Sequence, residues 1–168
     1  MSLVFLLGGA RSGKSALAVR LAERTGLPVT FLATGEARDE EMAERIARHR
    51  AARPAGWTTI EEPIDLLGAL GRVGADSCLV VDCLSLWVAN ALERGEETIE
   101  RQAEDVAARI AGRGPLSVVV SNEVGLGIVP FSNLGRRYRD VLGRVNARWA
   151  AAADEAAFVV AGRMLHLQ

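Results

Sequence analysis

The feature that most constrains this chain is a glycine-rich segment close to its N-terminus. Residues 8–15 fit the pattern G-x-x-x-x-G-K-[ST] at every fixed position, and they lie between the apolar run 3–7 and a helical pattern at 15–24. A loop that wraps a phosphate must turn several backbone N–H groups inward, which small residues permit. The sequence therefore predicts that the phosphates of ATP or GTP are bound by Gly8, Gly9, Ala10, Arg11, Ser12, Gly13, Lys14 and Ser15.

Two side chains of this segment carry most of its expected chemistry. Lys14 brings a positive charge to the β- and γ-phosphates, and the Ser15 hydroxyl is suited to ligate Mg²⁺. Such a site also needs an acidic residue at the end of a buried strand, and Asp82 follows the apolar run 79–81. We expect Asp82 to hold Mg²⁺ directly or through water. The alternatives are that it contacts another part of the nucleotide, is a solvated strand end, or caps the following helix.

Short apolar runs alternate with helical patterns along the whole chain. Strands are expected at 3–7, 29–33, 58–60, 78–82, 116–120 and 158–160, and helices at 15–24, 39–53, 63–70 and 134–153, with a further helical region broken near Gly95. This alternation predicts one α/β domain over residues 1–168, with helices on both faces of a mostly parallel sheet. A turn at 162–163 predicts an antiparallel edge strand over 164–167.

Composition excludes several classes of protein. The 20 Lys and Arg residues against 21 Asp and Glu give a net charge of -1, so no global basic field is available to hold nucleic acid. Cys78 and Cys83 are expected to be small buried residues, because their spacing fits neither a disulfide framework nor a zinc site. No apolar run is long enough to span a membrane, and no basic segment precedes the first apolar run as in a secretory signal. We expect a cytoplasmic protein.

His49 lies in a helical segment rich in arginine. It continues the apolar line of Met42 and Ile46, and this spacing alone favours a partly buried packing residue. Nearby cations, however, favour the neutral imidazole, which is the nucleophilic form, and they are suited to bind a polyphosphate. These cations are Arg45, Arg48, Arg50 and Arg53. The residues by themselves leave both interpretations open.

Further segments form a distinctive ordered set along the chain. After the glycine-rich loop come 45–54 around His49, 81–87, 120–125, 128–130, 137–140, 143–146 and 151–154. Together they resemble the bifunctional adenosylcobinamide kinase / adenosylcobinamide-phosphate guanylyltransferase family of cobalamin biosynthesis, from end to end. Two positions depart from that resemblance, since Ser85 stands where threonine is expected and Ala147 where glutamine is expected.

The resemblance implies a fold, two reactions and an assembly. The fold is a three-layer, RecA-like P-loop sheet, and the assembly is a homotrimer. One reaction phosphorylates adenosylcobinamide with a nucleoside triphosphate, and the other transfers GMP from GTP to the product, giving adenosylcobinamide-GDP. By motif, His49 is the residue that becomes guanylylated, with Lys14, Ser15 and Mg²⁺ stabilising the charge that leaves. ATP and GTP are substrates, and the partner is a small-molecule corrinoid.

Several carboxylates are candidates to read the guanine base. Glu61 and Glu62 resemble a family segment, and either is suited to accept hydrogen bonds from guanine, as is Asp82. The alternative for Glu61 and Glu62 is a favourable charge in the first turn of a helix. Glu123 follows a buried strand and is a candidate to support a metal or the base. Three arginines are expected to be a solvated helix face, namely Arg136, Arg137 and Arg139.

Two other functions compete with this hypothesis. A P-loop small-molecule kinase needs no covalent histidine, and so would lack guanylyltransferase activity. A nucleotide-driven motor or switch usually carries a tail or a basic track for its polymer, and the sequence shows neither.

Overall fold

The computed structural model describes residues 2–168, and its strands form a seven-stranded sheet in the order β3-β2-β4-β5-β1-β6-β7. Every neighbouring pair is parallel except β6 and β7, which are antiparallel. This confirms the mostly parallel sheet with an antiparallel C-terminal edge. The strands are β1 (Leu3–Gly8), β2 (Val29–Ala33), β3 (Thr58–Glu61), β4 (Cys78–Asp82), β5 (Ser117–Asn122), β6 (Glu155–Val160) and β7 (Arg163–Leu167).

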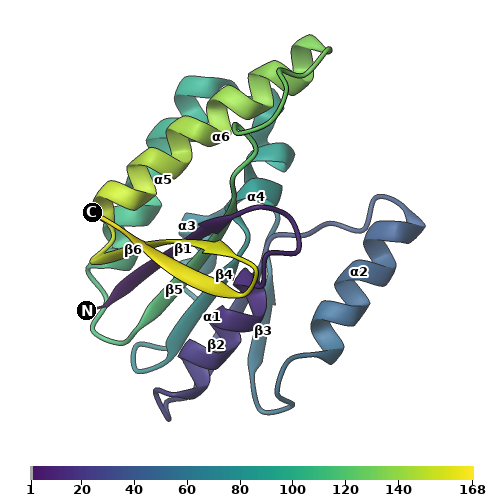
Figure 1. Cartoon of the computed structure of the whole chain (residues 1–168). Coiled ribbons are helices and arrows are strands. Elements are labelled where there is room, and N and C mark those ends of the chain that lie inside the picture. The colour runs from purple at the N-terminus through teal and green to yellow at the C-terminus, as the bar shows by residue number, and fades with distance from the viewer. Residues whose placement is uncertain (1) are drawn as a thin grey trace.

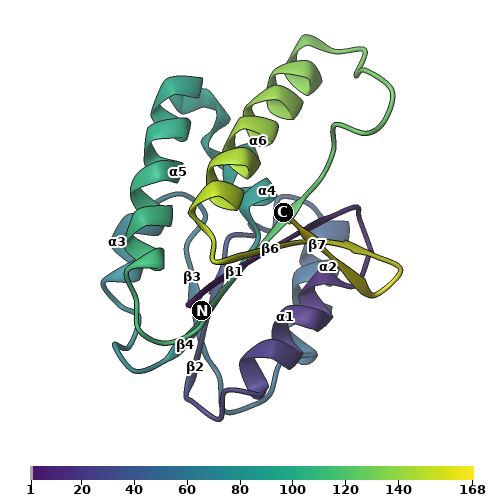
Figure 2. The ribbon, with the colours of Figure 1, turned by 60° about the vertical axis from the view of Figure 1, so that its left-hand side comes forward.

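Helices cover both faces of the sheet, as Figures 1 and 2 show. Successive side chains of a strand point to opposite faces, so Leu3 and Phe5 join one core while Val4 and Leu6 join the other. The first core packs against α3 (Leu66–Leu70), α4 (Leu84–Ala91), α5 (Glu96–Ala111) and α6 (Asn133–Ala152), and the second against α1 (Lys14–Glu23). A short 3₁₀ helix, Leu92–Arg94, precedes Gly95, where the long helical region is interrupted as predicted.

The remaining helix, α2 (Glu40–Ala51), stands beside the body of the fold next to β2 and β3 (Figure 1). It has no buried residue and begins at Asp39, whose side chain accepts a hydrogen bond from the Met42 amide. Its C-terminal end is the anchored end. There Arg50 forms an ion pair with Glu61, and the Arg53 guanidinium lies 3.7 Å from the centre of the Phe31 ring.

Three predicted boundaries were wrong, each for a local reason. The helix expected at Pro63 begins at Leu66, because the Glu62 carboxylate accepts hydrogen bonds from the amides that follow it and Asp65 caps the helix. β5 extends beyond Val120 to Asn122, because its pairing with β1 continues to the end of that strand. β6 begins at Glu155 rather than Phe158, because β1 pairs with it from Val4 onward.

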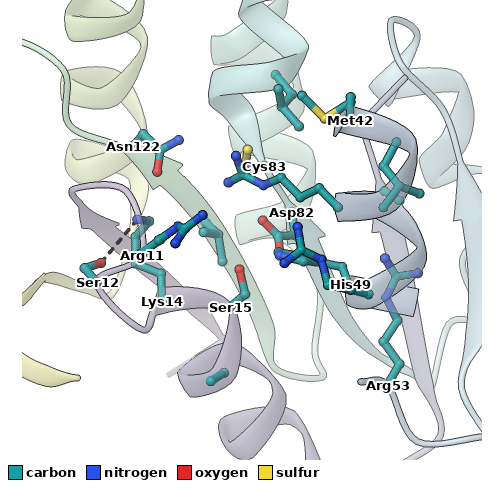
Figure 3. Close-up of a pocket in the computed structure, with 18 of the residues that line it drawn as sticks. Arg11, Ser12, Lys14, Ser15, Met42, His49, Arg53, Asp82, Cys83 and Asn122 are labelled. Carbon is teal, nitrogen blue, oxygen red and sulfur yellow. Dashed lines mark hydrogen bonds and ion pairs between the residues drawn. The ribbon is translucent and has the colours of Figure 1, made fainter. Parts of the chain in front are cut away.

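The topology gathers polar residues at one end of the sheet. In the order β4-β5-β1 the three central strands are parallel neighbours, so their carboxyl ends lie at the same edge. Asp82 closes β4, Asn122 closes β5, and the glycine-rich segment follows β1. Ligands of open α/β sheets bind at this edge, and here α2 stands across from it (Figure 3).

Candidate active site

The glycine-rich segment forms a phosphate-binding loop between β1 and α1. Arg11 and Gly13 have positive φ values of 56° and 100°, and turns of this left-handed kind make backbone amides converge on an anion. Gly13 is also the residue that precedes the first turn of α1, which contains no acidic side chain. The positive end of the helix dipole is therefore free to act on a phosphate.

The C-terminal hairpin supports this loop from behind. A Cβ atom on Gly8 would lie 2.3 Å from the carbonyl oxygen of Val159, so only glycine fits at the point where β1 enters the loop. The Gly162 amide, in the turn between β6 and β7, donates a 2.8 Å hydrogen bond to the Ser12 carbonyl. The turn between β6 and β7 thus helps to hold the loop that follows β1.

Lys14 is the only lysine in the sequence, and only 6% of it is exposed. Its Nζ donates hydrogen bonds to the Gly9 carbonyl at 2.6 Å and to the Ser12 hydroxyl at 3.3 Å. Burial lowers the pKa of Lys14, whereas Cys83 and Asp82 nearby act in the opposite direction. The loop therefore surrounds a desolvated amine, whose charge a bound phosphate would favour.

A cavity of about 430 Å³ opens between the loop and α2 (Figure 3). Its wall is more basic than the chain as a whole, which has a net charge of -1. Five of the residues that line it are cationic, namely Arg11, Lys14, Arg45, Arg48 and Arg53, and three are carboxylates, namely Glu41, Glu61 and Asp82. An excess of cations in a concave site favours a polyanion such as a triphosphate.

His49 projects into this cavity from α2, across from the phosphate-binding loop (Figure 3). Its Nδ1 lies 3.9 Å from Oδ2 of Asp82, and the two side chains are 41% and 11% exposed. This separation is too long for a hydrogen bond, but it places a carboxylate beside the ring on the Nδ1 side, with Nε2 as the other ring nitrogen. The packing interpretation of His49 explains neither the partner nor the cavity.

The outer part of the cavity has an apolar wall that the sequence analysis did not assign to the site. Met42 and Ile46 come from α2, Leu86 from α4, and Gly35 from the segment after β2. A Cβ on Gly35 would already touch Ile46 and Leu86 at 3.4 Å. The wall is suited to the flat faces of a purine base. The helical spacing of Met42, Ile46 and His49 was visible in the sequence. The sequence did not show that the segment after β2, at Gly35, lies opposite this helix face.

Buried polar contacts fix the turn that follows Asp82, whose peptide bond to Cys83 is cis. The Thr34 hydroxyl donates to the Cys83 carbonyl at 2.7 Å and accepts from the Cys83 amide at 2.9 Å. Asn122 donates to the Ser85 hydroxyl, which also contacts the Cys83 sulfur. Burial raises the pKa of Cys83 to about 11, so this thiol stays protonated at neutral pH. Cys78 is buried too, and neither cysteine is in a disulfide.

The predicted site residues are only partly brought together. Residues 11–15 line the cavity with His49, Glu61 and Asp82, whereas Gly8, Gly9 and Ala10 belong to the loop without lining the cavity. Glu62 does not line it either; its carboxylate accepts from the amides of Ile64 and Asp65 and lies 3.6 Å from Arg72. Glu123 accepts a hydrogen bond from the Gly125 amide. These two carboxylates stabilise turns in this structure.

The arginines of α6 also have structural partners. Arg136 donates to the carbonyls of Pro130 and Phe131, and Arg137 pairs with Glu96. Arg139 pairs with its neighbour Asp140, and its side chain is only 23% exposed, so it does not fit the simple picture of a solvated helix face either.

The oxygen atoms needed for Mg²⁺ are present in the cavity. Within residues 2–168 there is no group of three or more His, Cys, Asp and Glu side chains that could hold a metal ion. Mg²⁺ bound to a nucleotide does not need one, because phosphates and water complete its octahedron. The Ser15 hydroxyl and the Asp82 carboxylate both line the cavity and are hard oxygen ligands of the required kind (Figure 3).

None of the helices over residues 2–168 has the length and apolar character needed to cross a membrane.

Comparison with known proteins gives a consistent result. A sequence profile described as cobinamide kinase / cobinamide phosphate guanyltransferase matches residues 4–167. The bifunctional adenosylcobalamin biosynthesis protein CobP of Pseudomonas aeruginosa is 44% identical over 165 residues, which cover 97% of this chain and 95% of the relative. Proteins named bifunctional adenosylcobalamin biosynthesis protein CobU, from Salmonella typhimurium and Escherichia coli, are 39% and 35% identical over 95% of this chain and 96% of each relative.

Proposed function

The chain belongs to the cobinamide kinase / cobinamide phosphate guanyltransferase family, and from this membership we propose how its residues divide the two reactions. The enzyme phosphorylates the hydroxyl of adenosylcobinamide, and it transfers GMP from GTP to the resulting phosphate. The products of the second reaction are adenosylcobinamide-GDP and pyrophosphate. One observation carries the residue assignment: His49, with Asp82 beside its Nδ1, faces the phosphate-binding loop across a single cavity.

The loop is assigned to the β- and γ-phosphates. Its converging amides and the Lys14 ammonium supply positive charge, and Arg11 adds to it at the rim of the cavity. The Ser15 hydroxyl and Asp82 would hold Mg²⁺, which when bound neutralises part of the triphosphate charge. With the polyphosphate tail at the loop, the α-phosphate extends toward α2 and His49.

In the guanylyl transfer, His49 acts as the nucleophile. Its Nε2 attacks the α-phosphorus of GTP, and the bond to the bridging oxygen of the β-phosphate breaks. Pyrophosphate leaves, and a phosphoramidate remains on the histidine. A phosphate oxygen of adenosylcobinamide phosphate then attacks the same phosphorus and releases the imidazole. Asp82 stabilises the positive charge that the ring carries between the two steps.

In the kinase reaction the acceptor is the hydroxyl group of adenosylcobinamide. Its oxygen attacks the γ-phosphorus of ATP or GTP, the nucleoside diphosphate leaves, and the hydroxyl proton is lost to solvent or a carboxylate. Lys14 and the loop amides stabilise the charge that develops on the transferred group and on the diphosphate. His49 takes no covalent part in this step, which makes the two activities separable.

Glu61 is the carboxylate assigned to guanine. It lines the cavity and pairs with Arg50 through Oε1, which leaves Oε2 to accept, whereas Glu62 is occupied by backbone amides outside the cavity. The apolar wall of Met42, Ile46 and Leu86 would contact the base. Asp82 remains a second candidate acceptor for guanine. Glu123 does not line the cavity, so we assign it no direct contact with the base.

The decisive experiment uses GTP labelled at the α-phosphate. We expect wild-type enzyme to retain the label after denaturation, and His49→Ala to retain less than about one hundredth of it, because only the imidazole forms the phosphoramidate. His49→Ala should keep most of its kinase activity. The matched control is His166→Ala, since His166 is the only other histidine and lies on β7 paired with Glu155.

Label that persists in His49→Ala would overturn the assignment of the nucleophile. Wild-type enzyme that phosphorylates adenosylcobinamide but never takes up label would support the competing function, a P-loop kinase without guanylyltransferase activity. The proposal also includes a homotrimer, measurable by light scattering on the purified enzyme, and a cytoplasmic location, where GTP and ATP are available.

A further inference from the structure

A strip of apolar side chains lies in the open on the segment that connects β5 to α6. The exposed fractions are 81% for Leu126, 99% for Ile128, 58% for Val129, 103% for Phe131 and 65% for Leu134. No charged residue occurs between 124 and 131. We call residues 124–134 the apolar strip. A contiguous patch of exposed apolar side chains is typical of a binding site for a ligand or another protein.

Hydrogen bonds hold the two ends of the apolar strip, whose side chains face solvent. Arg136 donates to the carbonyls of Pro130 at 3.0 Å and Phe131 at 2.7 Å, and the Ser132 hydroxyl accepts from the Gly135 amide. At its other end, the Glu123 amide donates to the carbonyl of Gly8. The two ends of the strip are therefore held while its apolar groups face outward, which leaves less order to be imposed on binding.

The apolar strip follows a residue of the active-site cavity along the chain. Asn122 lines the cavity, and the chain passes directly from it into residues 123–131. Figures 1 and 2 both show this segment rising from the end of β5 to the far end of α6. It thus leads away from the place where the phosphates are held.

The second substrate needs a surface outside the cavity. A volume of about 430 Å³ suits one drug-sized ligand such as a nucleotide. Adenosylcobinamide is a far larger macrocycle, whose periphery carries methyl groups and uncharged amides around one flexible arm that ends in the reacting hydroxyl. Only that arm needs to enter the cavity, while the ring must rest on a surface next to it.

We propose that the apolar strip docks the corrin ring of adenosylcobinamide and its phosphate. The proposal rests on the function proposed above. The strip is uncharged, its apolar side chains suit the methyl groups of the ring, its two ends are held, and it starts two residues after Asn122 of the cavity wall. A second copy of the chain is the other occupant to consider, but its packing there would not explain how the ring is placed near the phosphates.

The test measures direct binding of adenosylcobinamide by equilibrium dialysis, with the bound ligand quantified by the absorbance of the corrin ring. The variant is Leu126→Ser/Ile128→Ser, which removes almost fully exposed side chains and therefore no core packing. We expect its Kd for adenosylcobinamide to rise by about tenfold or more, as for the loss of two apolar contacts. The affinity for GTP, the labelling of His49 and the size of the assembly should stay as in wild type.

The matched control is Leu27→Ser. Leu27 is 41% exposed and precedes β2, at the amino edge of the sheet and away from the cavity. An unchanged Kd in the double variant would overturn the docking site, and so would a smaller assembly, which would assign the strip to contact between copies. If wild type binds the corrinoid and the double variant does not, but neither takes up label, the docking site stands and the role of His49 fails.

Discussion

Asp82 is the residue on which most of the proposed chemistry converges. Its carboxylate lies 3.9 Å from Nδ1 of His49, yet it also faces the cavity that Ser15 and Lys14 line. One carboxylate has two oxygens, so one can lie beside the histidine while the other faces the space proposed for a nucleotide. The contacts of Thr34 with Cys83 fix the backbone just after it, which limits how far this carboxylate can move.

Gly8 offers a sharp test of how the loop is held. We expect Gly8→Ala to lower the free energy of unfolding by about 2 kcal/mol, because its Cβ would overlap the Val159 carbonyl and push β1 from β6. The nucleotide affinity should fall with it. Guanidinium unfolding and GTP titration measure the two effects.

Gly9→Ala is the control for this substitution. A Cβ at Gly9 meets no atom within 4 Å, so the free energy of unfolding should change by less than about 0.5 kcal/mol. Equal losses in the two variants would mean that close approach at Gly8 does not determine the stability of the loop.

At the scale of elements, α2 and the pair α5–α6 are held in contrasting ways. α2 buries no side chain and is anchored at one end by Arg50 and Arg53. α5 and α6 share an apolar core and a row of ion pairs along their exposed seam. In that row Arg144 pairs with Glu96 and Glu100, and Arg148 with Glu100 and Glu104.

Glu100 is the centre of this row, since both arginines contact it at 2.5 Å. We expect Glu100→Ala to lower the free energy of unfolding by about 1 kcal/mol, a value reduced by the partial exposure of the arginines. The loss should shrink in 1 M salt, which screens such pairs. Urea unfolding at low and high salt measures it.

Glu97→Ala serves as the reference for that measurement. Glu97 is exposed on the same helix and has no ion pair among the residues described. A similar loss for Glu97→Ala would trace the effect to the net charge of α5 rather than to the row.

At the scale of the molecule, the site is assembled from distant parts of the sequence. The loop comes from residues 8–15, the carboxylate from 82, the histidine from 49, and the support of the loop from the turn at 162. A ligand that contacts the loop, Asp82 and His49 must stabilise the whole fold, because it binds the native state and not the unfolded chain.

We therefore expect GTP with Mg²⁺ at one hundred times its Kd to add about 2.7 kcal/mol to the free energy of unfolding. For a chain of this size that corresponds to a rise in Tm of roughly 5–10 °C. Differential scanning calorimetry measures the shift. Chelation of Mg²⁺ should remove much of it, and Lys14→Ala should show almost none. A full shift in Lys14→Ala would contradict the assignment of the loop.

The sequence alone determined the parts that depend on local chemistry. The alternation of apolar runs with helical patterns fixed the element types, the parallel sheet and the final antiparallel strand, because periodicity reports directly on which faces are buried. The phosphate-binding loop was equally clear, since few residue types allow its backbone. Boundaries such as Leu66 and Asn122 were missed, because a carboxylate cap and a strand partner set them from outside the segment.

Only the tertiary structure decided which side chains share a cavity. In the sequence, Glu61, Glu62 and Glu123 were all candidates for the site. In the structure Glu61 lies in the cavity wall, whereas the carboxylates of Glu62 and Glu123 accept hydrogen bonds from backbone amides. It likewise placed Asp82 beside His49 and left residues 124–134 in the open. The physical reason is that distances between elements follow from how sheets and helices pack, and no local pattern records them.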